Sequence, residues 1–216
     1  TVPVQTGERV AQVIAREARP EADWEVASNP EFLREGSAVI DTLDPDRVVV
    51  GTTSERAEEA LRELYTPILD RSGAPFVATD RATAELIKHA SNAFLATKIS
   101  FINSVARVCE RSGADVDLVA RGMGLDPRIG VHFLKAGAGY GGSCFPKDVR
   151  ALVSLAGKHG MPSRLMEAVD RVNEDQKKQL GQKVRAHYGA GLRGKTLALW
   201  GLAFKPRTDD MREAPS

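Results

Sequence analysis

Residues Arg47–Ala78, RVVVGTTSERAEEALRELYTPILDRSGAPFVA, decide the fold class of the first part of the chain. The run around Val48–Val50 predicts a buried strand, and Pro75–Ala78 predicts another. Between them, Ser54 is a plausible N-cap for a helix over Glu55–Leu69. Strands that alternate with helices favour a parallel sheet of the α/β class.

The same alternation extends upstream. Residues Arg9–Ala15 follow a helical pattern that ends near Pro20, and Trp24–Ala27 predicts a short strand. Residues 1–80 are therefore expected to be the second half of an α/β sheet. Thr196–Trp200 predicts a buried-type strand that begins a new unit, and both ends of the chain look cut.

Helical patterns dominate after residue 80. Asp80 can cap a helix that runs from Arg81 to about Arg111 and stops at Gly113, where glycine supplies the left-handed residue. A helix of that length suggests a spine through an oligomer or between domains. Shorter helices are expected over Asp115–Met123, from about Pro146 to His159, and from Ser163 to Tyr188.

The composition excludes several classes of protein. The 216 residues are 42% hydrophobic and 27% charged, with 30 Lys and Arg against 29 Asp and Glu. That balance argues against a surface for nucleic acid or for an anionic membrane, and no apolar run has the roughly 20 residues that span a bilayer. Two cysteines are too few for a disulfide framework or a structural zinc site, so we predict a reducing, cytoplasmic compartment and no metal.

The most informative segment is GAGYGGSCFPKD, residues 137–148. Its glycines spell the dinucleotide fingerprint, but no strand pattern precedes them, so we reject that interpretation. Pro146 suits the first turn of a helix, which puts Cys144 at the helix N-terminus, near Lys147. Unpaired N–H groups and the helix dipole there favour a thiolate, and hence a nucleophile. A thiol packed beside a tight turn is an equal alternative.

Two other groups of residues are candidates for a site. Lys88 and Asn92 lie four apart in the long helix and share a face with small neighbours, although a solvated polar face is the usual meaning of such a pair. Glu31 and Glu35 follow a predicted strand, where ligands bind in open α/β sheets. Cys109, in contrast, shares an apolar helix face and is expected in the core.

Four segments occur in an order that resembles the UDP-glucose/GDP-mannose dehydrogenase family. They are NPEFLREG (29–36), ELIKHASNAFLA (85–96), GGSCFPKD (141–148) and GLAFKP (201–206), and together they extend over essentially the whole chain. Residues 128–130 and 133–135 resemble the UDP-glucose branch more than the GDP-mannose branch.

The resemblance implies a fold that is α/β followed by all-α. Residues 1–80 would be the remainder of an N-terminal Rossmann-like NAD-binding domain, 81–190 a central helical dimerisation domain with one long spine helix, and 191–216 the start of a UDP-sugar-binding domain. The glycine fingerprint would lie upstream of Thr1, which puts NAD binding by this chain alone in doubt.

The resemblance also implies an activity, the NAD-dependent four-electron oxidation of UDP-glucose to a uronic acid. Cys144 would be the nucleophile, Lys88 and Asn92 would stabilise the oxygen anion, Asp148 would position Lys88 or water, and Glu31 and Thr1 would act through that water. Substrate contacts would come from Phe32, Leu33, Glu35, Phe133, Lys135, Gly141 and Lys205, and from Arg128 across a homodimer. Glu35, Lys147 and Arg212 would bind NAD.

Two alternatives differ from this hypothesis. GDP-mannose or another nucleotide sugar could be the substrate, because little of the base-recognition region is in the chain. A helical dimerisation module without activity of its own would use the long helix as an interface and leave Cys144 vestigial.

Overall fold

The computed structural model describes all residues, Thr1–Ser216, and the chain divides into two compact units, Thr1–Ala90 and Ser91–Ser216. The first unit holds a two-stranded sheet and the second is helical. No helix combines the length and the apolarity that crossing a membrane requires.

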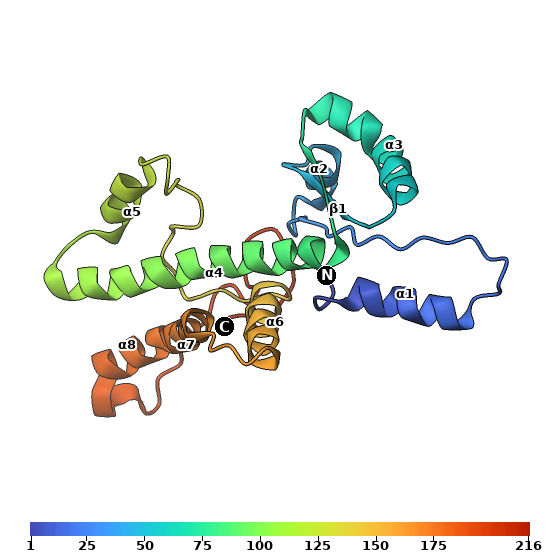
Figure 1. Ribbon diagram of the computed structural model, residues 1–216. Coiled ribbons are helices and arrows are strands. Elements are labelled where there is room, and N and C mark those ends of the chain that lie inside the picture. Colours follow the sequence, from blue (N-terminus) through green and yellow to red (C-terminus); the bar gives the residue numbers. More distant parts are fainter. The chain divides into compact units, whose positions relative to one another are not determined.

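The first unit contains the parallel pair that the sequence predicts (Figure 1). Strand β1 (Val48–Gly51) is buried throughout and pairs in register with β2 (Phe76–Thr79), from Val48 opposite Phe76 to Gly51 opposite Thr79. Helix α3 (Glu55–Ser72) connects them, and Ser54 caps it by accepting a hydrogen bond from the Ala57 N–H. Helices α1 (Thr6–Glu17) and α2 (Ala38–Leu43) complete the unit.

The strand predicted over Trp24–Ala27 is wrong. Only Ser28 reaches β1, in an isolated antiparallel bridge with Gly51. The preceding residues find side-chain partners instead: the Val26 carbonyl accepts from Thr52 and Arg81, and Asp23 pairs with Arg56. The Val26 carbonyl thus has side-chain donors in place of a neighbouring strand.

The long helix α4 (Arg81–Ser112) is continuous over 32 residues, as predicted. Asp80 accepts a hydrogen bond from the Thr83 N–H at its start, and Gly113 ends it at a φ of +76°. A residue with a Cβ would be strained in that left-handed conformation, so glycine is the natural stop. The boundary between the two units falls within this helix, after Ala90.

Shorter helices follow α4 in the second unit: α5 (Val116–Gly124), α6 (Phe145–Lys158), α7 (Arg164–Lys177), α8 (Gln179–Tyr188) and a 3₁₀ turn (Gly189–Leu192). The single helix predicted over Ser163–Tyr188 is therefore two helices. Helix α7 buries Val169 and Asn173, whereas α8 buries no residue. Burial therefore stabilises α7, whereas α8 has no buried residue that would favour one straight helix through Lys178.

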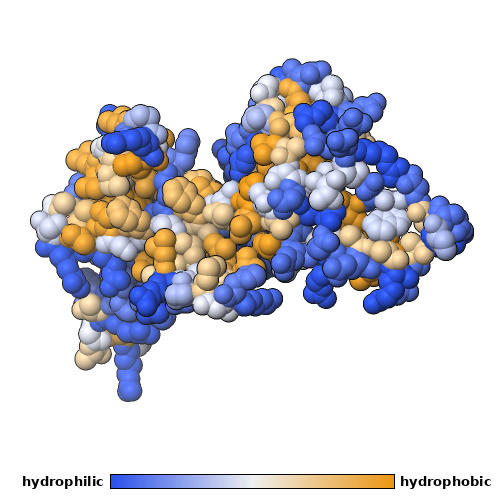
Figure 2. Space-filling model, viewed as in Figure 1, coloured by the Kyte–Doolittle hydropathy of each residue, from blue (hydrophilic) through white to orange (hydrophobic).

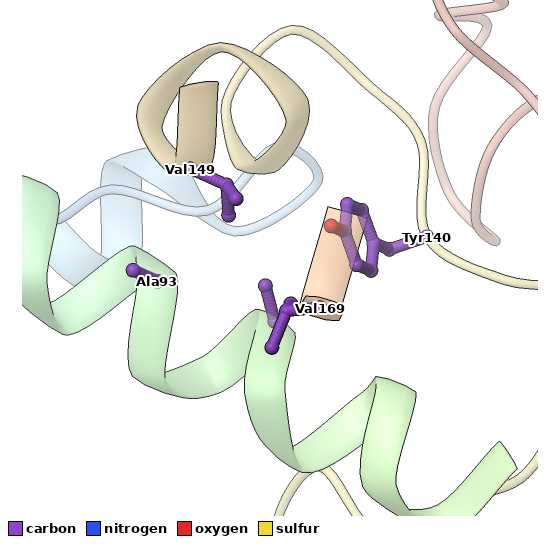
Figure 3. Packing of buried hydrophobic residues seen from close by; sticks show 5 residues of the cluster. Ala93, Tyr140, Val149 and Val169 are labelled. Carbon is purple, nitrogen blue, oxygen red and sulfur yellow. The ribbon is translucent and has the colours of Figure 1, made fainter. Parts of the chain in front are cut away.

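The core of the second unit lies where α4, α6 and α7 meet (Figure 3). Ala93 and Ala96 of α4 leave room for Val149 of α6, Val169 of α7 and Tyr140 of the connecting loop. Cys109 is also buried, which confirms its expected place in the core.

Asn173 of α7 fastens the loop that carries Tyr140. Its side-chain amide donates to the Tyr140 carbonyl at 2.9 Å and accepts from the Tyr140 N–H at 2.7 Å. One buried side chain thereby satisfies both backbone groups of a loop residue.

The strand predicted over Thr196–Trp200 does not form. The second unit has no strand with which it could pair. An unpaired strand leaves its backbone groups without partners. Leu197, Leu199 and Trp200 are exposed, in contrast to the burial that their apolar pattern predicts.

Candidate active site

Lys88 is the centre of the first group of predicted residues, which we call the lysine cluster (Thr1, Glu31, Phe32 and Lys88). Only 3% of Lys88 is exposed, and its Nζ lies 3.3 Å from Glu31 Oε1 and 5.3 Å from the centroid of the Phe32 ring. Burying an ammonium group is costly unless it is paired, so the carboxylate and the aromatic face make this position tenable.

A cavity of about 280 Å³ opens beside Lys88 and is also lined by Thr1. Two contacts fix the segment that follows Thr1. His89 Nε2 lies 2.8 Å from the Val2 carbonyl oxygen, and the Gly7 N–H donates to Glu85 Oε1 at 2.7 Å. The structure therefore brings Thr1 and Lys88, 87 positions apart in sequence, to one cavity.

The loop that follows Glu31 is held by Asp41. The Arg34 guanidinium and backbone N–H both donate to the Asp41 carboxylate, and Ser37 adds a third donor. These bonds, the Arg34 side chain foremost, lower the pKa of Asp41 to about 2. Leu33 donates its N–H to Glu31 Oε2 at 2.6 Å, so the loop also orients Glu31. Glu35 is half-buried in the same loop.

The second group, which we call the cysteine cluster, is Asn92, Cys144, Lys147 and Asp148. Cys144 is half-buried and is the N-cap residue of α6, with Pro146 in the first turn, as predicted. Asp148 closes the first turn by donating its N–H to the Cys144 carbonyl at 2.9 Å. The thiol thus stands at a helix N-terminus, where an anion is favoured.

Asp148 links the other members of the cysteine cluster. Its side chain is fully buried, and it accepts from Asn92 Nδ2 at 2.6 Å and from Lys147 Nζ at 2.8 Å. The ammonium group of Lys147 therefore has the carboxylate of Asp148 as its partner. Asparagine is unfavourable in the middle of a helix unless its amide has a partner, and Asn92 has one in the buried Asp148 carboxylate.

The remaining predicted residues of the second unit lie in the glycine loop, which we define as residues 137–143, and in the segments 128–135 before it and 205–212 near the C-terminus. Phe133 has a left-handed φ of +64°, and its ring lies 6.0 Å from that of Phe145. Arg128 is exposed and pairs with Asp126, and Arg212 pairs with Asp210. Lys135 is exposed, Gly141 is buried, and Lys205 Nζ lies 5.4 Å from the Phe204 ring centroid.

Sequence analysis missed several residues that support these clusters. Glu85 is buried and accepts hydrogen bonds from Gly7 and Ser28, and Glu213 pairs with Arg150. Glu85 lies one turn before Lys88, so its spacing was a usable signal. No signal in the sequence pairs Glu213 with Arg150, because 63 positions separate them.

Two family models match the chain. Residues 1–69 match the NAD-binding domain of the UDP-glucose/GDP-mannose dehydrogenase family, and residues 82–175 match the central domain of that family. Together the two matches cover most of the chain.

Similar proteins span the whole chain. This chain is 54% identical to a UDP-glucose 6-dehydrogenase of Rhizobium meliloti, over 100% of this chain and 49% of that relative. It is 53% identical to a UDP-glucose 6-dehydrogenase of Bacillus subtilis, over 100% of this chain and 48% of that relative. The structure of a UDP-glucose dehydrogenase from Pyrobaculum islandicum matches with a TM-score of 0.94 and 46% identity, over 100% of this chain and 49% of that one. The chain thus spans about half the length of the curated relatives it matches.

Proposed function

Because the chain belongs to the UDP-glucose/GDP-mannose dehydrogenase family, we propose that the protein oxidises UDP-glucose to UDP-glucuronate in two NAD-dependent steps at Cys144. One observation carries this proposal: a half-buried thiol at the N-terminus of α6 belongs to a chain whose long helix also bears a buried lysine and a buried asparagine. Lys88 and Asn92 lie one turn apart on α4, which suits two groups that serve one reacting carbon.

Lys88 and Asn92 would stabilise the negative charge that develops on the sugar's oxygen. A buried ammonium group acts strongly on such an anion, because little water screens it. Asn92 already gives one amide hydrogen to Asp148, and its other hydrogen would reach the same oxygen. Asp148 would keep the amide in that orientation.

Cys144 would hold the sugar carbon between the two oxidations. The first oxidation removes a hydride from the sugar's primary alcohol carbon and a proton from its hydroxyl, leaving an aldehyde. The Cys144 thiolate adds to the aldehyde carbon, forming a C–S bond and an alkoxide, and loss of a second hydride from that carbon leaves a thioester. Water then breaks the C–S bond, which releases the carboxylate and returns the thiol. Glu31 and Thr1 would position this water, with Glu31 accepting its proton.

NAD, when bound, supplies the hydride acceptor for both oxidations. Lys147 and Arg212, two exposed cations of the second unit that pair with Asp148 and Asp210, would bind its diphosphate by exchanging these carboxylates for phosphate oxygens. A guanidinium can bind a phosphate through two parallel hydrogen bonds. Glu35 would complete the set from the loop after Glu31. The sugar nucleotide would contact the residues of the loops, namely Phe32, Leu33, Glu35, Phe133, Lys135, Gly141 and Lys205.

We also propose that the protein is a homodimer joined through α4. Phe94, Phe101 and Val108 are each at least half exposed, and they recur every seven residues, so they form one stripe on the helix. Figure 2 shows apolar residues gathered on α4 and on α5. A second copy would cover this stripe, and Arg128 would then contact the substrate of the partner subunit. Phe101→Glu should convert the dimer to a monomer in sedimentation velocity.

A reducing compartment such as the cytoplasm suits this chemistry. Cys109 and Cys144 are both free thiols. Because the proposed nucleophile must be a thiolate, an oxidising compartment would inactivate it.

The experiment that tests the function counts the NADH formed per UDP-glucose consumed by the full-length protein. Two NADH per sugar, with Cys144→Ser abolishing uronate formation, would establish the double oxidation. One NADH per sugar would indicate an ordinary alcohol dehydrogenase. If UDP-glucose does not react, GDP-mannose and other nucleotide sugars are the next substrates to measure.

A further inference from the structure

The segment over residues 204–214 packs closely on the glycine loop that leads to Cys144. The Gly142 N–H donates to the Arg212 carbonyl at 2.8 Å. A Cβ on Gly142 would lie 2.8 Å from the Phe204 ring, and a Cβ on Gly141 would overlap the Glu213 carbonyl oxygen. The two glycines are therefore required here by close approach of another segment, in addition to any contact with substrate.

Ion pairs of Glu213 hold residues 204–214 in place. Glu213 Oε1 accepts from Arg150 Nη1 of α6 at 3.0 Å, and its Oε2 lies 3.7 Å from Lys177 Nζ of α7. The hydrogen bond with Arg150 is the main cause that lowers the pKa of Glu213, so the residue carries its charge at neutral pH. In Figure 1 the C-terminal label lies between α6 and α7, the two helices that these ion pairs join.

The backbone of Glu213 is strained. Its φ is +52°, a left-handed value that few residues other than glycine adopt. Such a conformation persists only where surrounding contacts hold it. The structure provides three such contacts, the ion pairs with Arg150 and Lys177 and the close approach to Gly141.

We propose that Glu213 is a positioning residue, whose ion pair with Arg150 holds residues 204–214 against Gly141 and Gly142 and thereby fixes the loop that presents Cys144. The proposal rests on the proposed role of Cys144 as the nucleophile. Arg150 lies in the second turn of α6, the helix whose N-cap residue is Cys144, so the ion pair joins residues 204–214 to the helix that the thiol precedes.

A double-mutant cycle on the full-length protein tests this role. Glu213→Ala, Arg150→Ala and the double variant are compared by the rate at which iodoacetamide alkylates Cys144, followed by peptide mass mapping, and by kcat and KM. A loosened loop should expose the thiol, so we expect each single variant to alkylate about threefold to tenfold faster and to lose kcat. Arg150 also pairs with Asp170 and Glu174, and Glu213 with Lys177, but the bond between Arg150 and Glu213 is the shortest that either makes. The effects of the two single variants should therefore not add, and the double variant should lie close to the more affected single variant.

Two further variants keep the experiment decisive. Glu213→Gln keeps an acceptor for Arg150 and should lie between wild type and Glu213→Ala; it also replaces that variant should it fail to fold. Glu110→Ala breaks another exposed ion pair of the same unit, with Lys183, and should leave both measurements unchanged.

Each outcome separates this proposal from the proposed function. Wild-type alkylation and kcat in Glu213→Ala, or effects of the two single variants that simply add, would overturn the positioning role. Should Cys144→Ser still form two NADH per sugar, the nucleophile would be misassigned, whereas the alkylation cycle would still report on the loop.

Discussion

The lysine cluster and the cysteine cluster are built by different means. Around Lys88, side chains make the site: Glu31, Phe32 and the bonds to Glu85 and Asp41 hold charged groups and loops in place. Around Cys144, backbone contacts contribute much of the structure, because Gly141 and Gly142 let residues 204–214 pack directly on the glycine loop. The lysine cluster should therefore respond mainly to lost charge, whereas the loop before Cys144 should respond to added volume as well as to loss of the Glu213–Arg150 ion pair.

The largest expected effect comes from Lys88→Ala, which removes the charge at the centre of the lysine cluster. We expect kcat of the full-length protein to fall about 100- to 1000-fold, the cost of removing one group that stabilises an oxyanion, while substrate affinity changes much less. Steady-state kinetics measures both. Lys158→Ala, which removes an exposed lysine at the end of α6, is the control. An unchanged kcat would remove Lys88 from this role.

Gly142→Ala tests the claim that the loop before Cys144 responds to added volume. The added methyl group would meet the Phe204 ring, and the φ of +78° is strained for alanine, so unfolding should become easier by about 2–3 kcal/mol. Gly157→Ala is the matched control, since it lies in α6 with open space around it and should be neutral or stabilising. Urea denaturation compares the two. Equal midpoints would show that the close approach is not present in solution.

Asp41→Asn should have the smallest effect, and only the lysine cluster should feel it. At neutral pH we expect a loss of about 1 kcal/mol, because Arg34 is largely exposed and solvent weakens the pair. The folded pKa of about 2 lies below the ordinary 3.8, so the stabilisation is complete above pH 4 and disappears as the pH falls toward 2. The difference between wild type and variant should therefore shrink in urea titrations on acidification, and a difference that grows would contradict the assignment.

Local patterns in the sequence predicted most helices, the parallel strands and the position of Cys144 at a helix start. Those features depend on neighbours a few residues apart, such as Ser54 with Ala57 or Asp80 with Thr83. The failures depend on distant partners. Trp24–Ala27 and Thr196–Trp200 have strand-like residues, but whether a strand forms depends on backbone partners far along the chain, which no local pattern reveals.

The clusters divide in the same way. Pro146 and the glycines before Cys144 predicted a thiol at a helix N-terminus, and the spacing of Lys88 and Asn92 predicted that they share one face of a helix. The partners that orient them could not be predicted from spacing. Asp148 faces Asn92 from a helix 56 positions away, and Glu213 meets Arg150 only in the folded chain.

Asn173 gives the loop before Cys144 a property that matters for protein engineering. Its side-chain amide gives the Tyr140 backbone one donor and one acceptor, as a neighbouring strand would in a sheet. A residue of helix α7 therefore holds the loop where no sheet is present. A graft of residues 137–148 onto another scaffold would need this amide from α7, and Asp at position 173 would not serve, because an ionised carboxylate cannot donate to the Tyr140 carbonyl. The portable unit is thus the loop together with α7.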